Sequence, residues 1–179
     1  MLLDRTEPEG IDPFVNVRPD LESADVAIVN LEMAITERGE PYEKEYVFRA
    51  PGSAALTLAG AGIDVVSLAN NHVFDFGREG LVDTISVLDE VGILRPGAGS
   101  NNAEAYAPRI LTLDNGVRVA FVSATAVVPG GFAAGADRPG VADAKWATPR
   151  VLAAVRAASA GNDVVVVSLH WGVEREPCP

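Results

Sequence analysis

With 179 residues, of which 48% are hydrophobic, the chain is long enough to fold as one compact domain with a sizeable core. Its formal net charge is −11 and it has no run of Lys and Arg, which argues against a surface for nucleic acid or an anionic membrane. The single cysteine, Cys178, excludes an intrachain disulfide and leaves the redox compartment open. No apolar run approaches the roughly 18–20 residues of a membrane span, and no signal-peptide stretch is present. We expect a chain that is soluble as given, with its cellular location unknown.

The spacing of apolar residues predicts strands that alternate with amphipathic helices. In chain order we expect a short helix at 18–24, a strand at 25–31, an extended segment at 46–49, a helix at 52–61, a strand at 64–69, a helix at 78–91, a short strand at 93–99, a hairpin of 109–113 with 117–122, a loop or flap at 129–145, a helix at 148–161 and a strand at 163–172.

Several of these elements carry their own boundary signals. Gly92 lies where a C-terminal helix cap belongs, and Asp114-Asn-Gly116 is a strong hairpin signal. Thr148 is expected as an N-cap, with Pro149 in the first turn. The alternation predicts an α/β fold of mostly parallel strands, with one inserted β-hairpin.

Three strands whose apolar runs indicate burial end in polar side chains. The three sets are Asn30 with Glu32, Asn70 with Asn71 and His72, and Ser168 with His170. Because the carboxyl ends of strands in one parallel sheet lie along one edge, we expect these groups to converge.

The residue types at these strand ends suit a divalent metal, which binds carboxylate oxygen, amide oxygen and imidazole nitrogen. Our hypothesis is that Glu32, Asn71 and His170 are metal ligands. His72 is then an acid–base group held near the metal. The alternative is that Asn70, Asn71 and His72 form only a polar turn that caps the next helix.

Other candidates are weaker. Asp75 is either a carboxylate that orients His72 or the N-cap of the helix near residue 78. Arg49 either reaches an anionic substrate or is simply solvated. Asn30 and Asn70 are possible supporting or substrate-binding groups. Trp171 either packs or forms a wall of the site, and packing is the better expectation.

The chain also resembles a known family along nearly its whole length, from about Asp20 onward. The resemblance is carried by Asn30-Leu-Glu32, Phe48-Arg-Ala-Pro51, Asp64-Val-Val-Ser-Leu-Ala-Asn-Asn-His72 with Asp75-Phe-Gly77, Gly97-Ala-Gly99 and Val167-Ser-Leu-His-Trp-Gly172. These look like the successive motifs of the CapA family of capsule and poly-gamma-glutamate synthesis proteins, which has a calcineurin-like metallophosphatase fold.

The resemblance implies a layered α/β/α core with a two-metal site of the Mn, Zn or Fe class at the strand ends. It implies that Glu32 is the acidic metal ligand, that Asn71 and His170 are further ligands, and that His72 is the general acid.

Two family motifs have no match in this chain. The family usually opens with a strand ending in Gly-Asp, which residues 1–19 lack, and it continues into a Gly-His-His-Pro-His type segment that does not appear before Pro179. We therefore expect residues 1–179 to be a single but partial CapA-like domain with an incomplete core, a fragment that binds metal weakly and is inactive alone.

The leading functional hypothesis is a capsule or poly-gamma-glutamate synthesis protein with a metal-dependent phosphoesterase-like hydrolase site. Its expected partners are an anionic polymer or phosphoester substrate and a capsule-synthesis membrane complex, not nucleic acid. The resemblance also implies an extracytoplasmic protein anchored through a segment absent here. The alternative is a non-catalytic assembly or polymer-binding subunit. A third reading, a nucleotide-binding α/β domain, is disfavoured because the chain has no phosphate loop.

Overall fold

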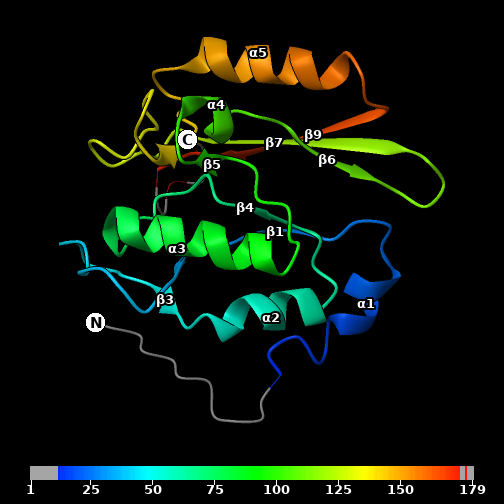
Figure 1. Cartoon of the computed structure of the whole chain (residues 1–179), viewed down its shortest axis with the longest axis horizontal. Helices are drawn as coiled ribbons and strands as arrows, with labels where there is room; N and C mark the ends of the chain where they lie inside the picture. Colours follow the sequence, from blue (N-terminus) through cyan, green and yellow to red (C-terminus); the bar gives the residue numbers. More distant parts are fainter. Residues whose placement is uncertain (1–11, 174–175, 177–179) are drawn as a thin grey trace. The chain divides into compact units, whose positions relative to one another are not determined.

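The computed structural model describes residues 12–173 and 176 (Figure 1). Within them the chain is a mixed α/β protein with parallel and antiparallel strand pairs. These residues divide into two compact units, 12–66 with 72–94 and 67–71 with 95–173 and 176. None of the helices in this described part of the chain is long and apolar enough to cross a membrane. The expectation that the chain is one partial domain stays a prediction.

The first unit is built from short strands and three helices among its described residues. Its elements are α1 (Arg18–Ser23), β1 (Ile28–Asn30), β2 (Ala34–Ile35), β3 (Arg49–Ala50), α2 (Ser53–Gly60), β4 (Val65–Ser67, the last residue grouping with the second unit) and α3 (Gly77–Glu90). Strand β1 pairs with β4, and β2 runs parallel to β3. All three helices begin and end within one residue of their predicted bounds, so these predictions are confirmed.

Helix α3 packs through one apolar face, as its sequence spacing predicts. Leu81 and Leu88 are fully buried, and Gly92 follows the helix with a φ of +78° that suits the predicted C-terminal signal. Gly80 has no room for a side chain, because a Cβ at this position would lie 2.9 Å from the Cβ of Phe76 and would also touch the Cβ of Ala34 at 3.4 Å.

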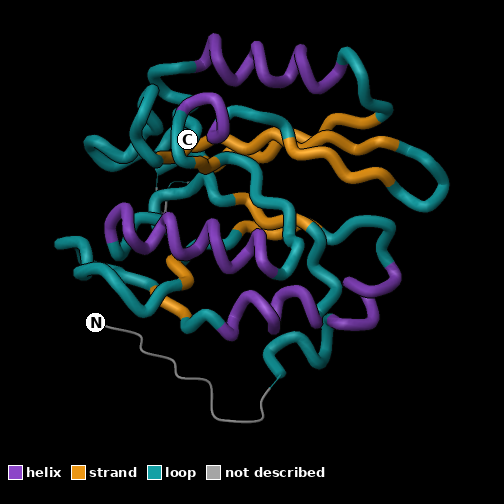
Figure 2. The backbone as a smooth tube through the Cα atoms, viewed as in Figure 1, coloured by secondary structure: helices purple, strands orange, loops and turns teal. Residues whose placement is uncertain are grey.

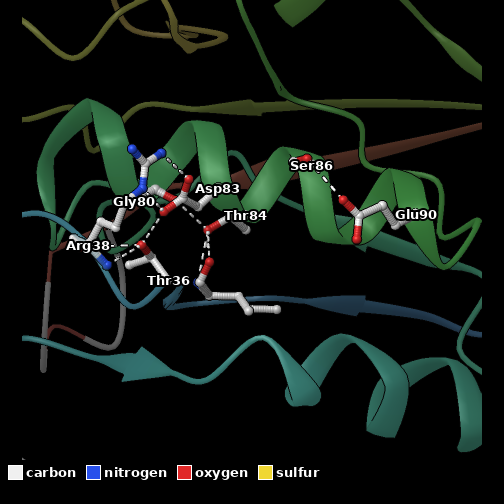
Figure 3. A network of polar contacts seen from close by, with 8 residues as sticks. Thr36, Arg38, Gly80, Asp83, Thr84, Ser86 and Glu90 are labelled. Atoms are coloured by element: carbon white, nitrogen blue, oxygen red, sulfur yellow. Dashed lines mark hydrogen bonds and ion pairs between the residues drawn. The ribbon is translucent and has the colours of Figure 1, made fainter.

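Thr84 joins α3 to β2 through a buried hydroxyl group (Figure 3). Its Oγ1 accepts a hydrogen bond from the Ile35 N–H at 2.8 Å and donates one to the Gly80 carbonyl at 2.7 Å. Beside it, the hydrogen bond from Arg38 holds the pKa of Asp83 below its usual range. These contacts hold the segment that follows Glu32 against helix α3.

The second unit holds the longer strands. Its elements are β5 (Ala98–Gly99), α4 (Asn102–Ala105), β6 (Arg109–Thr112), β7 (Arg118–Thr125), β8 (Gly140–Val141), α5 (Thr148–Ser159) and β9 (Val164–His170). One sheet has the order β6-β7-β9, in which β6 is antiparallel and β9 parallel to β7. Strand β5 is antiparallel to β8.

Helix α5 runs along one face of the β6-β7-β9 sheet, whose strands are orange in Figure 2. Ala154 and Ala158 of the helix pack on Ala120 and Val122 of β7. The predicted hairpin is confirmed as β6 and β7, and Gly116 in its turn has a φ of +85°. The parallel pairing of β7 with β9 across α5 confirms a βαβ unit, which sets the position of His170.

The prediction that three buried strands share one sheet is wrong. Strand β9 pairs with β7, whereas β1 pairs with β4. Within the described residues β9 lies at the edge of its sheet, so its Val167 and Leu169 are 42% and 45% exposed. Ile28 of β1 is also exposed, which leaves β4 as the strand whose predicted burial is confirmed. Trp171 is 63% exposed, so the expectation that it packs is wrong as well.

Smaller differences concern element ends and short elements. Thr148 is the first residue of α5 and not its N-cap. Its hydroxyl donates to the Ala144 carbonyl, whereas an N-cap hydroxyl would accept a hydrogen bond from an N–H of the first helical turn. Elements β2 and α4 were not predicted, and the predicted loop at 129–145 contains β8. Cys178 and most of the irregular N-terminal segment lie outside the described residues.

The buried hydroxyl of Thr84 yields a stability prediction. Thr84→Val keeps the shape of the side chain but leaves the Ile35 N–H without its acceptor, so we expect a loss of about 1–3 kcal/mol in the free energy of unfolding. Chemical denaturation measures this loss. Ser86→Ala, on the exposed side of the same helix, is the matched control and should change the free energy by less than about 0.5 kcal/mol. Equal stability of the two variants would contradict the role given to Thr84.

Candidate metal-binding and acid–base site

The chain stays buried as it leaves strand β4. Asn70 is 1% exposed, and Asp75 is fully buried. Polar groups buried in this way are stable only when they have hydrogen-bond partners. The polar residues that follow β4 are therefore held in place by specific contacts.

Asn71 and His170 meet within the second unit, although 99 residues separate them in the sequence. The Nε2 atom of His170 lies 2.9 Å from the Oδ1 atom of Asn71. His170 is the last residue of β9, where the parallel pairing places it opposite Thr125 of β7. This contact brings together two of the three predicted metal ligands.

The Asn71–His170 distance fits two neighbouring ligands of one metal ion. Two ligand atoms that each lie about 2.1 Å from a metal, at about a right angle, are about 3.0 Å apart. An amide oxygen and an imidazole nitrogen are both ligands that divalent metals accept. A hydrogen bond between these two atoms has the His170 Nε2–H as its donor, because an amide oxygen only accepts. A metal bound by Nε2 would take the place of that proton.

His72 is held within the first unit by the carboxylate of Asp75. The His72 Nδ1 and Asp75 Oδ2 atoms are 2.8 Å apart, and the Asp75 side chain is fully buried. This contact confirms that Asp75 touches His72, as the orienting role requires. The N-cap of α3 is Phe76, so the alternative that Asp75 is that N-cap is wrong. That Asn70, Asn71 and His72 form only a polar turn stays an alternative.

The loop before β3 surrounds the same carboxylate. The Phe48 N–H donates to Asp75 Oδ2 at 2.6 Å, and the ammonium group of Lys44 forms an ion pair with Asp75. Lys44 Nζ also lies 3.1 Å from His72 Nδ1. The Phe48 ring packs on the His72 ring, with their centroids 4.5 Å apart. The His72 ring thus contacts the Asp75 carboxylate, the Lys44 ammonium group and the Phe48 ring.

The remaining predicted residues of the first unit form separate contacts. Asn30, the last residue of β1, donates through Nδ2 to Glu32 Oε2 at 2.9 Å. The exposed Arg49 lies over the Phe76 ring at 4.6 Å and has no carboxylate partner among the residues described. The role predicted for Arg49, binding of an anionic substrate, stays a prediction.

The structure thus brings the predicted residues together in subsets. Asn71 and His170 meet in the second unit, while His72 with Asp75 and Asn30 with Glu32 meet in the first. Across the residues described, no three His, Cys, Asp or Glu side chains cluster as a metal site, and Asn71 contributes an amide ligand instead. Convergence of all the predicted ligands on one metal stays a prediction.

Sequence reasoning missed Lys44 and assigned no contact to Phe48. Lys44 lies in the charged run Glu43-Lys-Glu45, which resembles a solvated surface, and its contact with His72 spans 28 residues. Phe48 stands in the Phe48-Arg-Ala-Pro51 motif, and this motif was the one available signal that the loop belongs to the site.

An α/β chain that places imidazole, amide and carboxylate groups at the ends of its strands has the features of the α/β proteins that bind ligands at strand ends. The chain belongs to the family described as bacterial capsule synthesis protein PGA_cap, which matches residues 4–179.

Named relatives agree with this membership. The chain is 36% identical over 159 residues to a probable polyglutamine synthesis accessory protein of Mycobacterium tuberculosis, which covers 84% of this chain and 42% of the relative. It is 31% identical over 179 residues to the PGA biosynthesis protein CapA of Bacillus subtilis, covering 97% of this chain and 46% of that protein. A capsule biosynthesis protein CapA of Bacillus anthracis is 30% identical over 175 residues. The chain spans less than half the length of these relatives.

The Asn71–His170 pair yields a prediction about metal binding. Manganese(II) broadens the magnetic resonance signals of nuclei close to it, so a titration should broaden the His170 ring and Asn71 side-chain signals first. Binding should be weak, because only two ligands are joined within the second unit. Asn71→Ala should abolish the effect at His170, whereas Asn115→Ala in the exposed hairpin turn should preserve it. Broadening restricted to surface carboxylates, with His170 unaffected, would contradict the assignment.

Proposed function

We propose that this chain carries the metal-dependent phosphoesterase-like site of a capsule or poly-gamma-glutamate synthesis protein. The observation that carries the proposal is the 2.9 Å approach of His170 Nε2 to Asn71 Oδ1. Membership of the capsule synthesis family and the printed names of the relatives support the biological setting. The finer fold, a layered α/β/α metallophosphatase-like core, is part of the same proposal.

In this proposal Glu32, Asn71 and His170 hold divalent metal ions of the Mn, Zn or Fe class. Bound metal would polarise an anionic substrate and activate water. Glu32 brings a negative charge to the ligand set, while the amide and imidazole ligands are neutral. Asn30 orients the Glu32 carboxylate through its hydrogen bond, and the buried Asn70 supports the turn that carries Asn71.

His72 is the proposed general acid. Asp75 accepts the hydrogen on Nδ1, which directs Nε2 away from the carboxylate. A protonated Nε2 can then donate its proton to the oxygen of a leaving group. Arg49, which has no carboxylate partner in the described part of the chain, is placed in the proposal as a binding group for the anionic substrate.

The proposed substrates and partners are an anionic polymer or phosphoester and a capsule-synthesis membrane complex. An extracytoplasmic location with a membrane anchor belongs to the proposal as well. A non-catalytic assembly or polymer-binding role is the competing function, and one experiment separates it from catalysis.

A chimaera provides the test, with this chain replacing the matching region of the Bacillus subtilis relative. The purified manganese-loaded chimaera should hydrolyse a chromogenic phosphodiester, and it should restore polymer production to cells that lack the relative. We expect His72→Ala to lower kcat by about 10²–10⁴-fold, the usual contribution of a general acid. Trp146→Ala, at a side chain 81% exposed, is the control and should leave kcat unchanged.

Two results would contradict catalysis by His72. One is an unchanged kcat in the His72→Ala chimaera. The other is normal polymer production in cells that carry this variant, which would favour the assembly role.

A further inference from the structure

The loop around Lys44 contacts Asp75 through three of its residues. The Tyr42 N–H donates to the Asp75 carbonyl at 2.7 Å, and the Phe48 N–H donates to its Oδ2 atom at 2.6 Å. Between them, the Lys44 ammonium group forms an ion pair with Oδ1. All of these residues belong to the first unit.

The two oxygens of the Asp75 carboxylate therefore have different partners. Oδ1 faces Lys44, while Oδ2 faces the Phe48 N–H and the His72 Nδ1 atom. A fully buried carboxylate is costly unless it is paired and hydrogen-bonded, and Lys44 supplies the opposite charge. The attraction between Lys44 and Oδ1 favours the orientation in which Oδ2 is directed at His72.

The tautomer of His72 follows from this arrangement. An ionised carboxylate only accepts hydrogen bonds, so the imidazole must carry its hydrogen on Nδ1 to bond Asp75. Lys44 Nζ lies 3.1 Å from the same Nδ1 atom, but an ammonium group only donates. Two donors do not bond each other, so Lys44 acts on His72 through the carboxylate that both contact.

We propose that Lys44 is a positioning residue for His72. By holding Asp75 it fixes His72 as the Nδ1–H tautomer and directs the Nε2 atom away from the carboxylate. The purpose of this orientation rests on the proposed function, in which Nε2 is the atom that exchanges a proton with the substrate. The contacts among Lys44, Asp75 and His72 lie within the first unit and do not depend on the proposed function.

The test reads the tautomer directly. The chain has two histidines, so long-range proton–nitrogen correlation spectra of the ¹⁵N-labelled chain contain two imidazole patterns. At a pH where both rings are neutral, His72 should show a protonated Nδ1 and an unprotonated Nε2, with widely separated nitrogen shifts. In Lys44→Met we expect this separation to collapse, as the released carboxylate lets the two tautomers exchange. The His170 pattern, from the second unit, should be unchanged and serves as the internal reference.

Conservative replacement distinguishes positioning from general support of the fold. Lys44→Arg keeps the positive charge and should restore the separated nitrogen shifts of His72. A His72 pattern identical to that of the native chain in Lys44→Met would overturn the proposal, as would a collapse in Lys44→Arg equal to that in Lys44→Met.

Loss of both histidine patterns in Lys44→Met would mean that this variant does not fold. Lys44→Gln then takes its place, with the same expected collapse at His72 and the same overturning result. The readout needs neither metal nor substrate, so an inactive chimaera would refute the proposed function without affecting this result.

Discussion

The contacts that position His72 depend on one constraint, which is the burial of polar groups in the segment that follows β4. The chain passes from the apolar strand into Asn70 and Asp75 while remaining inside the protein. Buried polar groups must find partners, and here the partners come from distant parts of the sequence. The backbone of Phe48 and the His72 ring contact Oδ2 of Asp75, and the Lys44 ammonium group forms an ion pair with the same carboxylate.

The sequence predicted elements well where local patterns decide the outcome. The apolar face of α3 and the Asp114-Asn-Gly116 turn are local signals, and both elements were located within a few residues. Prediction from the sequence failed where pairing between distant segments determines the position of a strand. An apolar run such as Val164–His170 has the same composition in a central strand and at an edge, so burial of β9 was predicted wrongly.

The candidate site shows the same difference between local sequence signals and contacts of distant residues. Strand-end polarity was enough to single out Asn71, His72 and His170, and the Asn71–His170 contact agrees with that selection. Lys44 was missed because its surroundings in the sequence are charged and its partner Asp75 lies 31 positions further on. An ion pair of that span leaves no periodic signal. Family membership adds the setting of capsule synthesis, while less than half the length of the relatives is represented in this chain.

The central claim is that amide and imidazole groups from separate strand ends share one metal ion with a carboxylate. Anomalous diffraction at the manganese edge, from crystals of the chain grown with manganese(II), tests it most directly. The account predicts a metal peak within bonding distance of Asn71 Oδ1 and His170 Nε2, with Glu32 in the same coordination sphere. A peak at any other position, with His170 still hydrogen-bonded to Asn71, would contradict it.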